Sequence, residues 1–284
     1  MTSDDRPGER AADNAAPGVD EELREDRYVG GRDLTRWRTR VGDAIAAFAR
    51  WVGARMGPYT ALVITLLVGL ALVFLLSVAA VEVYDAVADE DGVAGIDEPL
   101  LLFMLGLRSP GLDVAVTAFT DVAGTIGMPV IAALGMVALG LTRRSWTPVV
   151  IIAAAGTGSL LMTIAGKELI QRERPPLIDA VPPFEYSPSF PSGHTLNAVA
   201  VVGAIAYLLV LRRTSRGARI AIVGGAVAFD ALVGMSRVYL GHHWFTDVLV
   251  GWILGALWLA LLITAHRLYL TIREQPRHRP AAIS

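Results

Sequence analysis

Long apolar runs separated by short polar segments dominate this 284-residue chain. Because about 20 apolar residues span the hydrocarbon core of a bilayer, runs of this length predict transmembrane helices. The predicted spans lie at approximately residues 60–83, 112–141, 146–170, 192–210, 220–239 and 244–265. The pattern therefore predicts an all-α polytopic membrane protein, a six-transmembrane-helix bundle within residues 57–270.

The second run is the least regular of the six. Asp121, Gly124, Gly127 and Pro129 interrupt it, and glycine and proline weaken or kink a helix. Two interpretations are open: one long, tilted or kinked span, or a short re-entrant piece followed by a span. We favour a single span.

The segments that flank the runs predict no further spans. Residues 1–40 are rich in acidic residues, glycine and proline, a composition typical of a disordered arm. Residues 41–56 mix Trp51 and other apolar residues with arginine, which suits an interfacial helix. Residues 97–107 are too short to cross and are expected at the interface, and residues 271–284 form a tail.

The arginines predict the orientation of the bundle. They concentrate at residues 32–55, 143–144, 212–219 and 267–279, and loops rich in arginine stay in the cytoplasm. Both termini are then cytoplasmic, in a multi-pass protein of the cell (plasma) membrane. The segments after the third span, before the fourth and between the fifth and sixth meet on the extracytoplasmic side.

Composition narrows the functional classes. The chain is 54% hydrophobic, which is high for a soluble domain, and its net charge of −2 suggests no nucleic-acid partner. It contains no cysteine, which excludes disulfides, thiolate nucleophiles and cysteine metal sites. No cluster has the spacing of a zinc or calcium site, so no metal and no cofactor is expected.

The first candidate site segment joins the fifth and sixth spans. Ser236 and Arg237 precede His243, and Asp247 follows it by four residues, a spacing that puts both side chains on one helical face. A carboxylate there can fix the tautomer of the imidazole and leave its other nitrogen free as a nucleophile. The plainer alternative is an ion pair at a helix start. His242 adjoins His243 but is expected to point elsewhere.

The second candidate segment, Pro191-Ser192-Gly193-His194, opens the fourth span. A helix N-terminus offers free N–H groups to an anion, and glycine lets the anion approach the backbone. His194 would lie beside that anion, placed to protonate a leaving oxygen. The alternative is an ordinary helix cap.

The third candidate segment follows the third span. Lys167 lies where that span reaches the interface, where it could simply snorkel, and Arg174 is followed by Pro175. The planar guanidinium of Arg174 can bind two phosphate oxygens at once. Arg172 and Glu173 are expected to face water or each other.

Together the three segments resemble the type 2 phosphatidic acid phosphatases, the PAP2 family, which share a core with vanadium haloperoxidases. The family pattern is Lys-x6-Arg-Pro, then Pro-Ser-Gly-His, then Ser-Arg-x5-His-x3-Asp. Every position is matched, by Lys167 with Arg174-Pro175, by Pro191-Ser192-Gly193-His194, and by Ser236-Arg237 with His243 and Asp247. The resemblance covers about residues 60–265 and implies a bundle of the PAP2/haloperoxidase-like type.

The resemblance also implies roles for these residues. His243 looks like the nucleophile that forms a phosphohistidine, Asp247 orients it, and His194 is similar to the family's acid and base. The implied phosphate cradle comprises Lys167, Arg174, Ser192, Gly193 and Arg237, without a metal.

The sequence therefore predicts a metal-independent integral membrane phosphatase. Its partner would be a lipid phosphate in the bilayer, such as undecaprenyl diphosphate, phosphatidic acid or phosphatidylglycerol phosphate. Two other readings are weaker: a lipid-binding or transport protein on the same scaffold, and an oxidative enzyme that holds vanadate.

Overall fold

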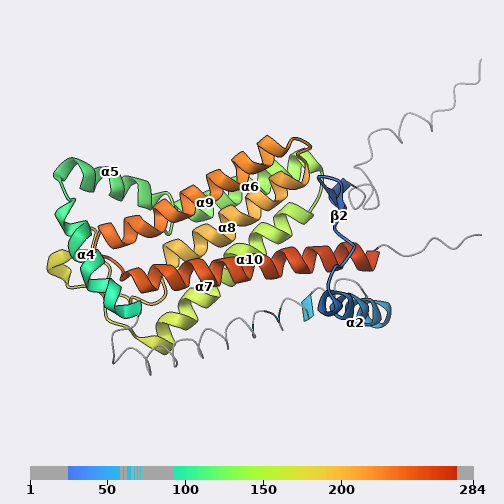
Figure 1. Cartoon of the computed structure of the whole chain (residues 1–284), viewed down its shortest axis with the longest axis horizontal. Helices are drawn as coiled ribbons and strands as arrows, with labels where there is room; N and C mark the ends of the chain where they lie inside the picture. Colours follow the sequence, from blue (N-terminus) through green and yellow to red (C-terminus); the bar gives the residue numbers. More distant parts are fainter. Residues whose placement is uncertain are drawn as a thin grey trace, which may run out of the picture.

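The structure is a computed structural model that describes residues 25–57 and 93–273, together with positions 60, 63, 64, 67, 69 and 71. Figure 1 shows a bundle of long helices with shorter helices at both of its ends. In chain order the elements are β1 (Tyr28–Val29), β2 (Arg32–Asp33), α2 (Arg40–Met56), the 3-10 helix η1 (Val93–Ile96), α4 (Asp97–Gly106), α5 (Pro110–Asp121), α6 (Gly127–Arg143), α7 (Thr147–Ile170), the 3-10 helix η2 (Leu177–Asp179), α8 (Gly193–Leu211), α9 (Arg216–Tyr239) and α10 (Phe245–Arg273).

Four helices of the described part, α7 to α10, are long and apolar enough to cross a membrane. They coincide with the third to sixth predicted spans. Large apolar side chains on the outer surface remain exposed, for example Leu134 at 64% and Val227 at 61%, as contact with lipid requires. The all-α prediction is confirmed, whereas the predicted span at residues 60–83 lies largely outside the described residues.

The favoured reading of the second run as one span is wrong. The run forms two helices: α5 ends at Asp121, a turn follows at residues 122–126, and α6 begins at Gly127. Val122, Ala123 and Gly124 donate to the carbonyls of residues 119–121 in that turn. Helix α6 is apolar but has only 17 residues, so the break agrees with the alternative of a short piece followed by a longer helix.

Helix α8 is the centre of the bundle and packs against α6, α7, α9 and α10. Leu196, Ala200, Ala204 and Leu208 recur every fourth residue along it, and each is completely buried. Helix α10 approaches α8 closely at Gly255, where an added Cβ would lie 2.7 Å from Cβ of Val199. Small residues at such a crossing let two apolar helices pack backbone to backbone.

The N-terminal part of the described chain lies at the end of the bundle where α10 finishes (Figure 1). Helix α2 matches the helix expected at residues 41–56 and packs on α10 through Ala46, Ala49 and Leu268. Residues 25–40 belong to the arm expected to be disordered, yet they include the β1–β2 hairpin. Asp26 there is buried and pairs with Nη1 of Arg143 at 3.2 Å, so this part of the arm is fastened to the bundle by charge.

Candidate active site

The three motif segments meet at the other end of the bundle, near α4 and α5 (Figure 1). Lys167 lies in the last turn of α7, His194 in the first turn of α8 and Arg237 in the last turn of α9. His243 lies in the turn that leads into α10, and Asp247 lies in the first turn of α10. Helix ends from four elements therefore supply the site, as the alternation of spans predicted.

Glycine makes the α9–α10 turn possible. Gly241 has a φ of +71°, a left-handed conformation that favours glycine, and an added Cβ there would lie 2.1 Å from the carbonyl oxygen of Asp179. The backbone N–H groups of His242 and His243 both donate to the carbonyl of Arg237, at 3.0 and 3.3 Å. These bonds close the end of α9 and place His243 against the loop between α7 and α8, where it meets Arg174 and Ser189.

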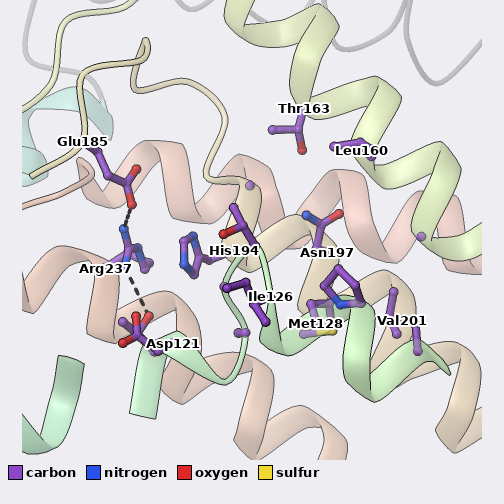
Figure 2. Close-up of a pocket in the computed structure, with 18 of the residues that line it drawn as sticks. Asp121, Ile126, Met128, Leu160, Thr163, Glu185, His194, Asn197, Val201 and Arg237 are labelled. Carbon is purple, nitrogen blue, oxygen red and sulfur yellow. Dashed lines mark hydrogen bonds and ion pairs between the residues drawn. The ribbon is translucent and has the colours of Figure 1, made fainter. Parts of the chain in front are cut away.

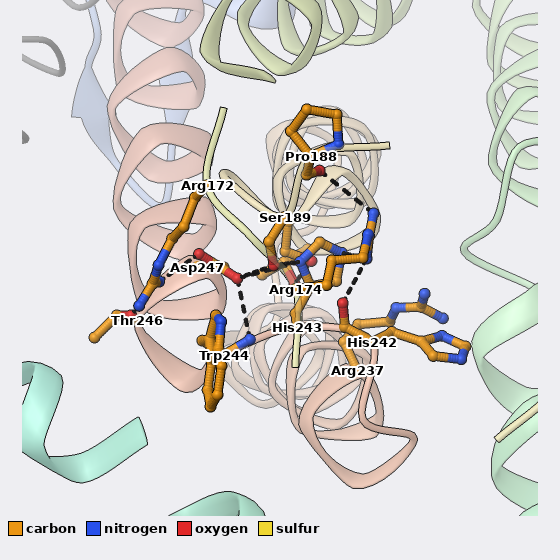
Figure 3. Close-up of polar contacts among 12 residues, drawn as sticks. Arg172, Arg174, Pro188, Ser189, Arg237, His242, His243, Trp244, Thr246 and Asp247 are labelled. Atoms are coloured by element: carbon orange, nitrogen blue, oxygen red, sulfur yellow. Dashed lines mark hydrogen bonds and ion pairs between the residues drawn. The ribbon is translucent and has the colours of Figure 1, made fainter. Parts of the chain in front are cut away.

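The two ring nitrogens of His243 face different groups (Figure 3). Nδ1 lies 3.5 Å from Oδ2 of Asp247 and 3.3 Å from Oγ of Ser189. Nε2 lies 3.4 Å from Nη1 of Arg174, a group that can only donate. This network favours the tautomer with the proton on Nδ1 and a lone pair on Nε2.

Asp247 is held by more partners than the sequence indicated. It is completely buried and accepts from the N–H of Trp244 at 3.0 Å and from Nη1 of Arg172 at 2.6 Å. Arg172 also donates from Nη2 to Asp97 at 2.9 Å. The expectation that Arg172 faces water or Glu173 is wrong, because two buried carboxylates draw its guanidinium inward.

Asp97 completes this arrangement from α4. Its two oxygens accept from the backbone N–H and the hydroxyl of Thr246, at 2.8 and 2.6 Å. Carboxylates at a helix N-terminus satisfy free N–H groups and the positive end of the helix dipole. Asp97 and Ser189, a buried residue bonded to Asp247, were missed because no spacing links them to the motif.

Arg174 and Arg237 both contact Glu185, a residue that no sequence motif indicated. Nη2 of Arg174 lies 2.8 Å from Oε2 of Glu185, and Nη2 of Arg237 pairs with Oε1 (Figure 2). The Arg237 side chain is only 2% exposed, and Nη1 donates to Oγ1 of Thr120 at 3.3 Å. A chain segment between η2 and α8 thus joins two motif arginines from different segments.

Of the remaining predicted residues, some line the cavity and Ser192 makes hydrogen bonds beneath it. Gly193 and Lys167 line the cavity, and Nζ of Lys167 donates to the carbonyl of Pro188. Ser192 is completely buried; its N–H donates to the carbonyl of Asp247 at 3.2 Å and its hydroxyl accepts from Thr195 at 2.9 Å. The geometry thus turns the Ser192 hydroxyl toward its own helix.

The cavity beside these residues has a volume of about 1170 Å³ and two contrasting ends. Figure 2 shows Glu185, Arg237 and Asp121 at the polar end, with His194 between them and an apolar end. The apolar end is lined by Met128, Met136, Ile152, Leu160 and Val201. His242, expected to point elsewhere, also lines the polar end.

Burial and charge set the ionisation of the loop residues at this site. Burial lowers the pKa of His243 to about 4, although Asp247 favours its protonated form, so the ring is neutral at pH 7. Burial disfavours the charge on Glu185, but Arg237, His243 and Arg174 outweigh it and lower its pKa to about 2. The ring of His243 is therefore neutral beside an ionised Glu185, which lies among the cations of the site.

The charged groups suit an anion better than a metal. Among residues 25–57 and 93–273, no three His, Cys, Asp or Glu side chains gather as metal ligands. The cations of Lys167 and Arg237 and the helix N-terminus at Gly193 line the polar end, and Arg174 reaches it through its contacts with Glu185 and His243. Such groups bind and polarise phosphoryl oxygens.

Comparison with known proteins identifies the family. The family model of the PAP2 superfamily matches residues 144–269. Phosphatidylglycerophosphatase B of Bacillus subtilis is 36% identical over 194 residues, which cover 67% of this chain and 89% of that protein. This chain belongs to the PAP2 superfamily. The resemblance seen in the three motifs is confirmed, and the chain is a membrane phosphatase of the hydrolase class.

Other PAP2 proteins extend the comparison. The crystal structure of a transmembrane PAP2-type phosphatidylglycerolphosphate phosphatase from Bacillus subtilis superposes with a TM-score of 0.58 at 32% identity, covering 69% of this chain and 92% of that one. Decaprenylphosphoryl-5-phosphoribose phosphatase of Mycobacterium tuberculosis is 32% identical over 136 residues, 46% of this chain and 67% of that protein. The relatives of this PAP2 chain are thus lipid phosphatases.

Proposed function

We propose that this PAP2 protein removes the terminal phosphate of an amphiphilic lipid through a phosphohistidine at His243. The observation that carries the proposal is the pair of contacts made by the His243 ring, with Nδ1 at 3.5 Å from Asp247 and Nε2 at 3.4 Å from Arg174. The lone pair of Nε2 is thereby directed toward a guanidinium that can hold phosphate. His243, the proposed nucleophile, thus lies between Asp247, which orients it, and Arg174, which would bind the anion.

In the first step, the Nε2 lone pair forms a bond to phosphorus and the bond to the leaving oxygen breaks. His194, on the cavity beside His243, gives its proton to that oxygen, so the product leaves as a neutral hydroxyl or a protonated phosphate. The N–H of Nδ1 stays with Asp247, whose charge stabilises the ring as it becomes cationic.

In the second step, water attacks phosphorus and gives a proton to His194. The bond between phosphorus and Nε2 then breaks, and its electron pair returns to the ring. Lys167, Arg174, Arg237 and the backbone at Gly193 neutralise the charge on the phosphoryl oxygens in both steps, a role often taken by a metal. Ser192 positions Gly193 through its bond to Asp247.

The substrate class follows from the two ends of the cavity. The polar end suits a terminal phosphate, and the apolar end between α6, α7 and α8 suits an acyl or prenyl chain. Undecaprenyl diphosphate, phosphatidic acid and phosphatidylglycerol phosphate share this design. The names of the relatives, which act on phosphatidylglycerol phosphate and a decaprenyl-linked phosphate, support the same class.

Phosphate release from a panel of these lipids by the purified full-length protein tests the proposal. His243→Ala is expected to lower the turnover of every good substrate by at least about 1000-fold while the variant elutes as a folded protein. Undiminished release by His243→Ala would refute the assigned nucleophile.

We also propose that the site opens to the extracytoplasmic side and that both termini are cytoplasmic. The arginine distribution supports this orientation. Because the chain has no cysteine, Tyr186→Cys, at a side chain that is 82% exposed, gives a unique label near the site. An impermeant thiol reagent should label it in intact cells, but not Thr214→Cys between α8 and α9. The reverse labelling pattern would invert the topology.

A further inference from the structure

The carboxylate of Glu185 is bound where the proposed substrate phosphate would be bound. One oxygen, Oε2, lies 2.8 Å from Nη2 of Arg174, and the other, Oε1, pairs with Nη2 of Arg237. Nδ1 of His242 lies 3.8 Å from Oε1. Glu185 thus bridges two arginines that belong to different motifs, at the polar end of the cavity (Figure 2).

A guanidinium binds a carboxylate and a phosphate through the same planar pair of N–H groups. The Nη2 groups that hold Glu185 therefore cannot give their full hydrogen bonding to a phosphate at the same time. If Arg174 and Arg237 grip the substrate, as the proposed function requires, the incoming anion must exchange with Glu185.

We propose that Glu185 is a specificity-determining residue, a resident anion that only a doubly charged terminal phosphate displaces. This inference rests on the proposed function of the same arginines. A terminal phosphate carries a charge of about −1.5 to −2 at pH 7, whereas a phosphodiester carries only one negative charge. A phosphodiester thus offers the arginines no more charge than the carboxylate that it must replace.

The surroundings of Glu185 allow the exchange. Its side chain is 29% exposed, so it can turn toward water when it is released, whereas Arg237 is 2% exposed and cannot. A buried guanidinium without a counter-charge is costly, and Glu185 supplies that charge between turnovers. The same exchange returns the carboxylate to the arginines when inorganic phosphate leaves.

This mechanism has a physical purpose in a bilayer. Phospholipids with phosphodiester headgroups surround the protein at high concentration, and their tails fit an apolar cavity as well as those of a substrate. Charge competition from Glu185 raises the affinity that any anion needs to occupy the site, so a weakly held phosphodiester headgroup stays out without a steric barrier.

Equilibrium binding tests the inference on the full-length protein in detergent micelles. The ligands are a short-chain phosphatidylglycerol, which is a phosphodiester, and inorganic phosphate, each titrated calorimetrically. Glu185→Gln removes the charge but keeps the shape, and Glu185→Ala removes both. Glu173→Gln is the matched control, because Glu173 is an exposed carboxylate of the same loop.

Both Glu185 variants are expected to bind phosphatidylglycerol about tenfold more tightly than the wild type, or more, because a charge-assisted contact no longer competes. Phosphate should also bind more tightly, and Glu173→Gln should stay within about twofold of the wild type. Unchanged or weaker diester binding in either Glu185 variant would overturn the inference. Weaker binding would mean that Glu185 holds Arg237 in its binding position instead of competing with the ligand.

The outcome also separates this inference from the proposed function. If the wild type binds phosphate and releases it from lipids but the Glu185 variants bind no more tightly, only the role of Glu185 fails. If the wild type neither binds phosphate nor releases it from any lipid, the proposed function fails and this inference fails with it.

Discussion

Arg172 donates from Nη1 to Oδ1 of Asp247 at 2.6 Å, and this contact ties the loop after α7 to the first turn of α10. The Asp247 side chain is fully buried, whereas that of Arg172 is 23% exposed. The residue that orients the proposed nucleophile therefore depends on a cation just outside the matched motif positions. Asp97 holds the other side of the same guanidinium.

Arg172→Ala is expected to destabilise the protein by about 1.5–3 kcal/mol, because a hydrogen bond to a charged, buried group is lost. Turnover should fall as well, since Asp247 loses the cation that holds its Oδ1 and is oriented toward His243 only by its contacts with Trp244 and Ser189. The free energy of unfolding in detergent and kcat for one lipid phosphate measure the two effects. Arg213→Ala, at an exposed arginine after α8, is the control, and equal results for both variants would contradict the assigned role.

The stability of the protein should depend on pH through His243. Burial lowers its pKa to about 4, below the value of about 6.5 for an unperturbed imidazole. The unfolded chain therefore binds the proton more readily, and stability falls as the pH drops from 6.5 toward 4. Between pH 7 and pH 4 the protonation of this group should lower the free energy of unfolding by roughly 3 kcal/mol.

His243→Gln removes that contribution and should make the unfolding free energy less sensitive to acid by a similar amount. Other buried groups also stabilise the protein less as the pH falls, among them Glu185 with a pKa of about 2. These groups are present in both proteins. Arg237, which lowers the pKa of Glu185 more than His243 does, is kept in the variant, so the comparison reports mainly the imidazole. Identical pH dependence in wild type and variant would mean that His243 is already free to take up a proton.

The apolar end of the cavity should discriminate between long and short lipids. An added Cβ at Gly156 would lie 3.8 Å from Cγ2 of Val201, an ordinary contact distance on the cavity wall. Gly156→Leu should therefore fill the cavity without breaking the helix contact. We expect KM for a long-chain lipid phosphate to rise by about tenfold, because a hydrophobic contact of this size is worth about 1–3 kcal/mol.

A short-chain lipid phosphate provides the internal comparison, since its KM should change little in Gly156→Leu. Gly224→Leu makes the same substitution on an exposed face of α9, where an added Cβ meets nothing within 4 Å, and should leave both KM values unchanged. Equal loss for long and short substrates would place the lipid chain elsewhere.

Much of the site could be predicted because its signals are local. The i, i+4 spacing of His243 and Asp247 sets their proximity, although His243 lies in the turn before α10 and not on the helix, and Pro191 with Ser192 marks the start of α8. Alternation of the spans then brings the segments to one end of the bundle. Each of these inferences needs only helix geometry and the thickness of a bilayer.

The parts that the sequence did not predict depend on long-range contacts. Glu185 lies in an irregular loop. No periodic pattern in the sequence of that loop predicts its contacts with two arginines from the motif segments. The break between α5 and α6 was underestimated, because residues such as Gly124 and Gly127 are tolerated inside a membrane helix as well as in a turn. Arg172 was expected to face water because its two carboxylate partners, Asp97 and Asp247, are each 75 residues away in the sequence.

The most direct test of the central claim is to trap and locate the phosphorylated residue. In His194→Ala the first step loses its acid and the second its base, but the lipid monophosphate that leaves a prenyl diphosphate needs protonation less than water needs a base. A prenyl diphosphate with a radiolabelled terminal phosphate should therefore leave an acid-labile label on the protein. Peptide mapping is predicted to find that label on His243, and the double variant with His243→Ala to carry none. Label on any other residue, or label that persists in the double variant, would contradict the account.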